Sequence, residues 1–316
     1  YGRKGAITDD TQMTLFTAEG LLRAYCREII RGIPAAYDST IYRAYLRWLY
    51  TQGMKSANED FTCAQDGWLL TVGDLHHRRA PGDTCLSALQ SARMGTPEKP
   101  INSSKGCGGV MRAAPVGLFA SKALQSAEHQ GNEWKKVFDL GCQVAAITHG
   151  HPSGYLPAGC LATIIYGIIS GLTIEEAIKK TLTVLKKAKG YEETLDAIKL
   201  AMALWKKKMA KPNPETLEKM GGGWVGEEAL AISLYCALSA EGDFAGGIRL
   251  AVNHTGDSDS TGSITGNILG AMLGKAAIPA HWIEELELKE VIEEMAGDLF
   301  VLFGNGDRWR QKYPGF

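Results

Sequence analysis

The sequence lacks the cysteine patterns that would point to a disulfide framework or a structural zinc site. It contains no C-x-x-C pair, and its cysteines are odd in number and widely scattered. Reduced, mostly buried thiols are therefore expected, as in a cytoplasmic protein. The seven cysteines are Cys26, Cys63, Cys85, Cys107, Cys142, Cys160 and Cys236.

The chain also has little net charge and no long hydrophobic run. Its formal net charge is −1 over 316 residues, so no overall field favours nucleic acid or a membrane surface. The longest apolar stretch, "CLATIIYGIIS", is too short to span a bilayer, and no signal peptide is visible. We expect a monomer with no membrane partner and no nucleic-acid partner.

Alternating strand patterns are almost absent, whereas helical periodicity is strong. The segment "TQMTLFTAEGLLRAYCREII" places one apolar stripe at spacings of three and four residues, formed by Leu15, Ala18, Leu22, Cys26 and Ile29. "TIEE" at 173–176 predicts a capping box at the start of another helix. The breaks are short and rich in Gly and Pro, which predicts one all-α domain over residues 1–316.

Two short segments are unusually rich in carboxylates and hydroxyls. "AITDDTQ" holds Thr8, Asp9 and Asp10, and "GDSDSTGSITGN" at 256–267 holds two further aspartates. Neighbouring carboxylates repel, so a cation, a helix N-terminus, or both must compensate. Helix capping explains either segment by itself, and a hard divalent cation, which prefers oxygen ligands, is the alternative.

The second acidic segment invites comparison with a calcium-binding EF-hand loop. Asp257, Asp259, Thr261 and Gly262 occupy positions 1, 3, 5 and 6 of such a loop. Position 12 should then be Glu, but it is Ile268. An EF-hand is therefore excluded.

A glycine-rich segment, "SSKGCGGVMRAAPVGLF", precedes another helical pattern at 103–119. Backbone N–H groups at Gly106, Gly108 and Gly109 would suit a phosphate, and tight helix packing explains the same glycines equally well. Arg112 could pair with a phosphate or a carboxylate, or could brace the loop.

The segment "THGHPSGYLPAG" at 148–159 contains His149 and His151. A zinc site is not favoured, because no third ligand is obvious nearby. A loop offering His, Gly and Tyr could instead hold a ribose or stack on a base.

Taken together, these segments resemble the ADP-ribosylglycohydrolase family. They occur in the family's order and cover nearly the whole chain: "ITDDTQMTLFTAEGLLRA", "KGCGGVMRAAPVGLF", "THGHPSGYLPAGCLA", "GGGWVGEEALAISLYCAL" and "FAGGIRLAVNHTGDSDSTGSITGNILGA". The resemblance implies a compact all-α bundle that hydrolyses the N- or O-glycosidic bond between ADP-ribose and a modified side chain.

The resemblance also implies a set of site residues. Two divalent cations, Mg²⁺ or Mn²⁺, would lie between the acidic segments, orient the ribose hydroxyls and activate a water. Asp259 would bridge the two cations, and Asp9, Asp10 and Asp259 would be catalytic. The implied cation ligands are Thr8, Asp9, Asp10, Asp257, Asp259 and Ser260. The implied ADP-ribose contacts are Gly106, Cys107, Gly108, Gly109, Val110, Met111, His149, Gly154 and Tyr155.

One departure from the family pattern concerns a glutamate that normally precedes the "TDDT" motif. Only seven residues precede Thr8 here; none is acidic, and the chain does not begin with Met. Glu19 and Glu28 do not fit that place. We therefore expect that an N-terminal segment is missing and that this chain hydrolyses slowly, since a positioned acid or base typically contributes about 10²–10⁴-fold in rate.

Three functions remain open at this point. The "GDSDSTG" and "CGGVMRA" segments resemble the arginine-specific branch of the family more than the serine-specific one, which favours removal of ADP-ribose from arginine. The alternative is a non-catalytic protein that binds ADP-ribose or blocks a transferase, which the missing glutamate would favour. A structural protein on the same scaffold would be expected to lose the cation ligands, and this chain keeps them.

Overall fold

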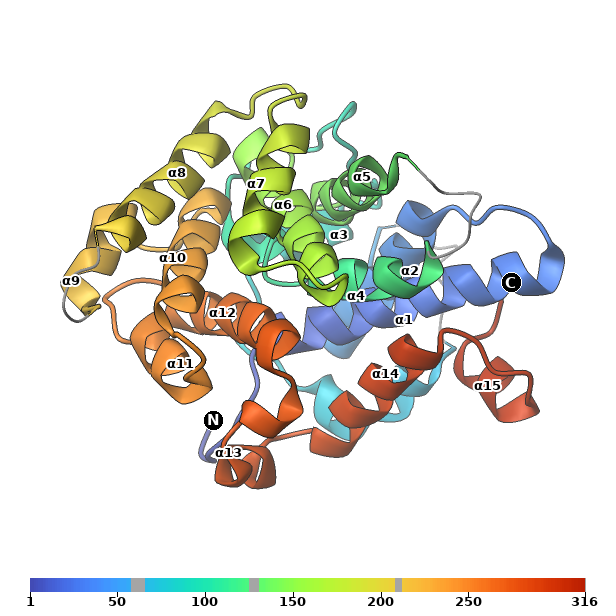
Figure 1. Ribbon diagram of the computed structural model, residues 1–316. Coiled ribbons are helices and arrows are strands. Elements are labelled where there is room, and N and C mark those ends of the chain that lie inside the picture. Colours follow the sequence, from blue (N-terminus) through green and yellow to red (C-terminus); the bar gives the residue numbers. More distant parts are fainter. Residues whose placement is uncertain (58–65, 125–130, 208–211, 316) are drawn as a thin grey trace.

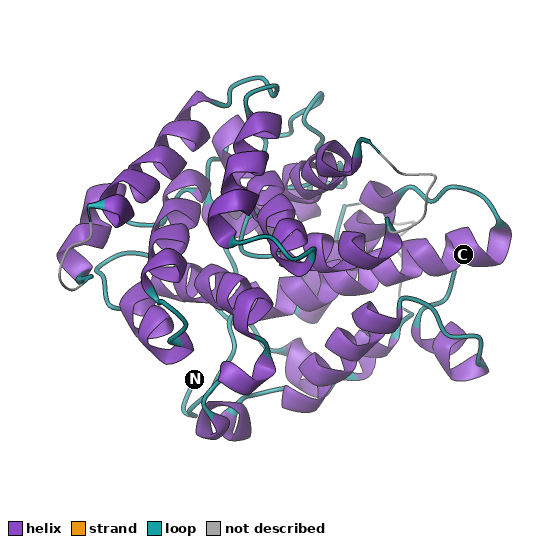
Figure 2. Cartoon of the chain, in the orientation of Figure 1, coloured by secondary structure: helices purple, strands orange, loops and turns teal. Residues whose placement is uncertain are grey.

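The computed structural model describes residues 1–57, 66–124, 131–207 and 212–315, so Cys63 lies outside the described residues. Within those ranges the chain forms 15 helices and no strand, apart from one isolated antiparallel bridge between Gly106 and Val225. Figure 2 shows helices joined by loops throughout. The prediction of an all-α fold is confirmed.

The helices follow one another through mostly short connections, with brief 3-10 turns between some of them. Their bounds are α1 Asp9–Arg31, α2 Tyr37–Thr51, η2 Trp68–Thr71, η3 Gly73–His76, α3 Asp83–Gln90, η4 Cys107–Gly109, α4 Ala114–Ala123, α5 Glu133–Ala146, α6 Pro152–Ile169, α7 Ile174–Leu185, α8 Glu192–Lys206, α9 Pro214–Leu217, η6 Glu218–Met220, α10 Gly226–Ser239, α11 Phe244–Val252, α12 Ser258–Leu273, η7 Lys275–Ala277, α13 Ala280–Glu285, α14 Lys289–Val301 and α15 Asp307–Lys312.

Local sequence signals set several helix ends. Helix α7 begins at the predicted capping box: the Thr173 hydroxyl accepts from the Glu176 N–H, and the Glu176 carboxylate accepts from the Thr173 N–H. Helix α1 ends at Gly32, whose φ of 64° is left-handed and whose N–H donates to the Glu28 carbonyl. The capping-box prediction is therefore confirmed.

The apolar stripe predicted for α1 is buried along most of its length. Leu15, Ala18, Leu22 and Cys26 are at most 4% exposed. Ile29 is 48% exposed, so the prediction is wrong at that position. Ile30, in the same last turn of α1, is 47% exposed as well, so the burial of the helix ends before this turn.

Helix α6 is the central helix of the fold and packs against α4, α5, α7, α10 and α12 (Figure 1). It has 18 residues and a mean hydropathy of 1.3, so by length and composition it could cross a membrane. The protein itself buries 78% of it. Core helices of proteins that enter no membrane pass the same test, so this is weak evidence for a membrane span.

Six of the seven cysteines lie in the described ranges, and none of those six forms a disulfide. Five of them are buried, as expected for small apolar side chains. Cys107 is only partly buried.

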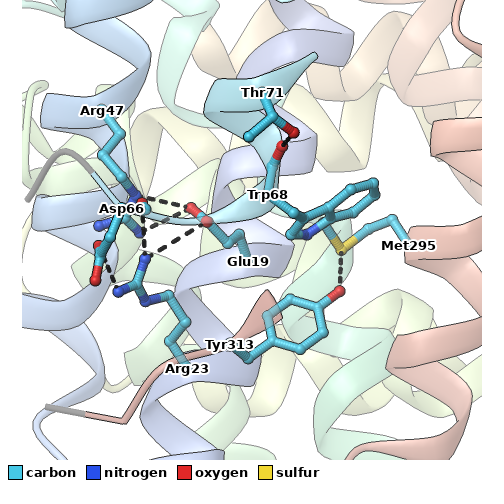
Figure 3. A network of polar contacts seen from close by, with 8 residues as sticks. All are labelled: Glu19, Arg23, Arg47, Asp66, Trp68, Thr71, Met295 and Tyr313. Atoms are coloured by element: carbon cyan, nitrogen blue, oxygen red, sulfur yellow. Dashed lines mark hydrogen bonds and ion pairs between the residues drawn. The ribbon is translucent and has the colours of Figure 1, made fainter. Parts of the chain in front are cut away.

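A buried ion-pair network joins α1 to α2 and to the segment that begins at Asp66 (Figure 3). The Glu19 carboxylate accepts hydrogen bonds of 3.0 and 2.7 Å from Nε and Nη2 of Arg47. Arg23 Nη2 donates to Asp66 Oδ1 at 2.8 Å, and Arg23 Nη1 lies 3.6 Å from Glu19 Oε1. Because Glu19, Arg23 and Arg47 are all excluded from solvent, the network fixes how α1 is rotated against α2.

A close contact between α5 and α6 allows a stability prediction. A Cβ at Gly159 in α6 would lie 2.5 Å from Cys142 Sγ and 2.8 Å from the Phe138 carbonyl of α5, whereas a Cβ at Gly270 in α12 would meet nothing within 4 Å. We expect Gly159→Ala to lower the free energy of unfolding by about 1–3 kcal/mol through overpacking. Gly270→Ala should be neutral or stabilising by about 1 kcal/mol. Urea unfolding of both variants tests this, and equal effects would contradict it.

Candidate active site

Acidic residues from opposite ends of the sequence line one cavity of about 450 Å³. Asp9 and Asp10 lie in the first turn of α1, and Asp257, Asp259 and Ser260 lie at the start of α12, which packs against α1 (Figure 1). One carboxylate oxygen each from Asp9, Asp10 and Asp259 lies within 4.8 Å of the other two. Both segments are helix N-termini, whose partial positive charge favours carboxylates.

Backbone hydrogen bonds hold the two acidic segments in place. The Asp9 N–H donates to the Arg79 carbonyl at 2.9 Å, and the Gly82 N–H donates to Asp9 Oδ2 at 3.3 Å. On the other side, the Asp257 N–H donates to the Gly222 carbonyl at 2.8 Å. The aspartates are therefore positioned by loops as well as by their own helices.

The two hydroxyls predicted for this site, those of Thr8 and Ser260, lie in different surroundings. The Thr8 hydroxyl donates to Asp10 Oδ2 at 3.2 Å and does not itself line the cavity. Ser260 lines the cavity, whereas the neighbouring Thr261 hydroxyl is buried and donates to the Ala251 carbonyl at 2.9 Å. The geometry thus places Ser260, rather than Thr261, among the carboxylates.

The carboxylates are short of positive charge. Burial, with repulsion from Asp259, raises the pKa of Asp9 to about 7, and burial raises the pKa of Asp10 well above its usual value, with a further contribution from Asp9. Burial and Asp259 raise the pKa of Asp257 to about 6. Asp10 Oδ1 is buried and has no hydrogen-bond partner within the described ranges. These groups fit a hard cation, which takes oxygen ligands and removes the repulsion.

Some residues of the glycine-rich loop face the cavity, and others pack against the helices behind it. Gly106, Cys107, Gly108 and Met111 line the cavity. Gly109 packs behind the loop, because a Cβ there would lie 2.5 Å from the Gly154 carbonyl, and its neighbour Val110 is fully buried. Tight packing therefore accounts for Gly109. Gly106 and Gly108 lie on the cavity wall, and the Gly106 N–H donates to Ser104 Oγ at 3.2 Å.

His149 and Arg112 lie next to this loop and help to hold it in place. His149 lines the cavity, and its Nδ1 is 2.8 Å from the Thr148 hydroxyl. Burial and the Arg112 charge lower the pKa of His149 to about 3, so its ring is neutral. Arg112 is fully buried and donates to the Val144 carbonyl and the Thr148 hydroxyl. Of the roles considered for Arg112, bracing the loop is the one observed.

Gly154 and Tyr155 do not lie in a loop, so that part of the prediction is wrong. They belong to the first turn of α6, because His151 caps this helix and Pro152 begins it. His151 Nδ1 accepts from the Ser153 N–H at 3.1 Å. The Tyr155 side chain is 9% exposed, packs into the core, and does not line the cavity.

Several cavity residues were not foreseen from the sequence. Trp224 lines the cavity and is 63% exposed, and its carbonyl accepts from the Cys107 N–H at 3.1 Å. The three glycines before Trp224 were the signal that could have found it, since such a run predicts a turn that presents the next side chain. The segment from Ala80 to Cys85 also contributes to the wall, and no sequence motif marks it.

No glutamate of the described ranges lines the cavity. Glu19 is held in the ion-pair network, and Glu28 accepts a hydrogen bond from the Tyr37 hydroxyl at 2.9 Å. Neither residue takes the place of the glutamate that the family resemblance implies.

A larger cavity of about 770 Å³ lies elsewhere, between α1, α4, α6, α12 and α14. Its wall is mainly apolar and carries no carboxylate in the described part of the chain. The smaller cavity is therefore the candidate active site, because it alone of the two brings carboxylates together.

The known proteins similar to this chain include three relatives, two of which carry the same name. The chain is 25% identical over 305 residues to the ADP-ribosylarginine hydrolase Tri1 of Serratia proteamaculans, covering 94% of this chain and 68% of that protein. It is 22% identical to the protein of the same name from Pseudomonas putida, covering 94% and 66%. An uncharacterized protein of Archaeoglobus fulgidus is 28% identical over 197 residues, and the match spans only 58% of that protein's length.

A solved structure and a family model agree with these relatives. The chain resembles a structure described as an ADP-ribosylglycohydrolase-related protein complex, with a TM-score of 0.64, 25% identity, and coverage of 94% of this chain and 82% of that one. The ADP-ribosylglycohydrolase family model matches residues 1–308. Because this match covers almost the whole sequence, the chain belongs to the ADP-ribosylglycohydrolase family.

Proposed function

We propose that this protein is a metal-dependent hydrolase that releases ADP-ribose from modified arginine side chains. The observation that carries the proposal is the convergence of Asp9, Asp10 and Asp259 within 4.8 Å in one cavity. Family membership supports glycohydrolase chemistry, and two relatives carry the name ADP-ribosylarginine hydrolase, which supports arginine as the linkage.

The cation ligands would be four of the five aspartates that line the cavity, Asp9, Asp10, Asp257 and Asp259, together with the hydroxyls of Thr8 and Ser260, with Asp259 bridging two ions. When bound, Mg²⁺ or Mn²⁺ would orient the ribose hydroxyls and polarise the attacking water. Buried, mutually repelling carboxylates and the orphaned oxygen of Asp10 support a site built for positive charge.

The remaining cavity residues would hold and orient the substrate. The backbone of Gly108 on the cavity wall would offer its N–H group to the diphosphate, and the exposed Trp224 ring would offer a flat surface to a base or a guanidinium. Proton transfer falls to a cavity carboxyl, with Asp10 the first candidate, because no glutamate of the described ranges lines the cavity.

The activity itself is the first test. We expect the purified protein, supplied with Mg²⁺ or Mn²⁺, to release ADP-ribose from an arginine-linked substrate faster than from serine- or acid-linked substrates, measured by mass spectrometry of the product. Asp259→Asn should reduce the rate by at least about 100-fold if it bridges the ions. Binding of ADP-ribose without any release would favour the non-catalytic alternative.

Cation binding provides a second test that does not depend on turnover. Calorimetric titration with Mn²⁺ should show an affinity at least about tenfold weaker in Asp259→Asn than in the unaltered protein. Asp139→Asn is the matched control, because this aspartate pairs with Lys135 on the surface, away from the cavity. Equal Mn²⁺ affinities in all three proteins would remove the basis for the metal site.

The glycine loop provides a third test. A Cβ at Gly108 would lie 3.0 Å from the His149 ring and 3.1 Å from Cys85 Sγ, so a valine must displace the loop into the cavity. We expect Gly108→Val to weaken ADP-ribose binding by about tenfold or more, or about 1.4 kcal/mol. Gly73→Val is the control, because a Cβ there meets nothing within 4 Å. Unchanged ADP-ribose affinity in Gly108→Val would leave the loop with a packing role only.

A further inference from the structure

The larger cavity, between α1, α4, α6, α12 and α14, has the dimensions of a binding site for a small molecule. Its volume is about 770 Å³, and none of the described residues that line it also lines the candidate active site. Pockets that bind small molecules typically enclose about 300–1,000 Å³ and have mainly apolar walls with a few polar groups that fix the orientation of the ligand. The larger cavity is therefore a candidate for a second, separate binding site.

Apolar side chains from several helices form most of the wall of the larger cavity. Leu15 of α1, Leu118 of α4 and Leu299 of α14 are among them. Ile169 and Phe300 also line the cavity, although they are 43% and 70% exposed. Because water makes few hydrogen bonds to such a wall, displacement of this water by the apolar body of a ligand is favourable.

One cationic side chain stands on this apolar wall. Lys122 lies in the last turn of α4, and its Nζ is 4.2 Å from the centre of the Phe300 ring. Lys122 forms no ion pair within the described ranges, and no carboxylate of those ranges lines the cavity. Its ammonium group carries three hydrogen-bond donors, which an anionic group of a ligand could accept.

A second polar group of the wall also lacks a partner. Asn267 of α12 lines the cavity, and its Nδ2 is buried without a hydrogen-bond acceptor in the part of the chain that the structure describes. An unpaired buried N–H group is costly, and a ligand oxygen would satisfy this one after a rotation of the side-chain amide. Both unmatched groups are donors, so they favour a ligand with acceptor oxygens.

We propose that the larger cavity binds an amphipathic carboxylic acid, with its hydrocarbon body along the apolar wall and its carboxylate on Lys122. A neutral apolar molecule would leave the ammonium group of Lys122 without a partner, and a cationic one would be repelled by it. No covalent bond forms or breaks on binding. The proposal is independent of the proposed function, because the two cavities share no described residue.

Decanoate is the probe, titrated into the protein below the concentration at which it forms micelles and followed by calorimetry. 1-Decanol, which has the same chain length and no charge, is the comparison ligand. We expect saturable binding of decanoate at one site, with an affinity at least about tenfold higher than that of 1-decanol, since hydrogen bonds between charged groups are the stronger ones. No saturable binding of decanoate, or equal affinities for the two ligands, would overturn the proposal.

A lysine variant tests the place of the carboxylate. Lys122→Met keeps the apolar stem of the side chain and removes its charge. We expect it to weaken decanoate binding by at least about tenfold and to leave the affinity for 1-decanol nearly unchanged. Lys180→Met is the matched control, because the Lys180 Nζ also lies over an aromatic ring, 5.2 Å from the centre of Trp134, but does not line the larger cavity. Equal decanoate affinities in Lys122→Met and the unaltered protein would contradict the assigned contact.

A second variant tests the cavity itself. Ala296 lines the cavity from an exposed position on α14, so a larger side chain there can occupy the space without disturbing the core. We expect Ala296→Phe to weaken the binding of both ligands by at least about tenfold. The control is Gly297→Phe, since the next residue does not line the cavity and a Cβ there meets nothing within 4 Å.

Unchanged decanoate affinity in Ala296→Phe would place the ligand elsewhere and overturn the proposal. Circular dichroism of each variant shows whether it is folded. A protein that binds decanoate in this way but never releases ADP-ribose would count against the proposed function and not against this site. An active protein that binds no decanoate would count against the site alone.

Discussion

The structure depends on keeping the carboxylates of Asp9, Asp10, Asp257 and Asp259 in one small cavity against their mutual repulsion. They come from the N-terminal turns of α1 and α12, so two helix dipoles favour them, and the Gly82 N–H donates to Asp9. These contributions do not offset burial, because the pKa of Asp9 and of Asp257 is still raised to about 7 and about 6. The close approach of these carboxylates must therefore be maintained by packing elsewhere in the protein. A positive charge in the cavity would stabilise them.

That packing is strongest directly behind the aspartates. One turn along α1, Gln12 donates to the His77 carbonyl at 2.9 Å and accepts from the Trp48 indole at 3.1 Å. Farther along, Glu19 is locked between buried arginines, and breaking a buried ion pair of this kind costs about 3–5 kcal/mol. Helix α12 is held similarly, since the Ser233 hydroxyl of α10 donates to the Thr261 carbonyl. The scaffold stabilises both helices independently of the cavity, which allows the cavity to remain electrostatically unfavourable.

Residues close together in the sequence could be interpreted from their own pattern, whereas contacts between distant segments could not. The meeting of the two acidic segments was expected only from the family resemblance. Apolar periodicity predicted the helices, and the Thr173 capping box identified one helix start. Periodicity failed at Ile29, because it does not show where the neighbouring helices end. The approach of Cys107 to Asp257 spans 150 positions and has no local signal. The sequence also could not show whether the loop glycines bind a phosphate or pack against a helix. The packing of Gly109 against the Gly154 carbonyl depends on the position of α6, which no local pattern predicts.

The glycine loop is attached to both halves of the cavity. The Cys107 N–H donates to the Trp224 carbonyl, Gly106 bridges to Val225, and the Cys107 thiol donates to Asp257. The backbone proposed to receive a diphosphate therefore cannot move without disturbing Asp257, a proposed cation ligand, and the exposed tryptophan. Because such coupling is reciprocal, a cation that fixes Asp257 also fixes the loop, and a diphosphate that orders the loop favours the cation. Cation binding and ADP-ribose binding are thus expected to strengthen each other through Cys107.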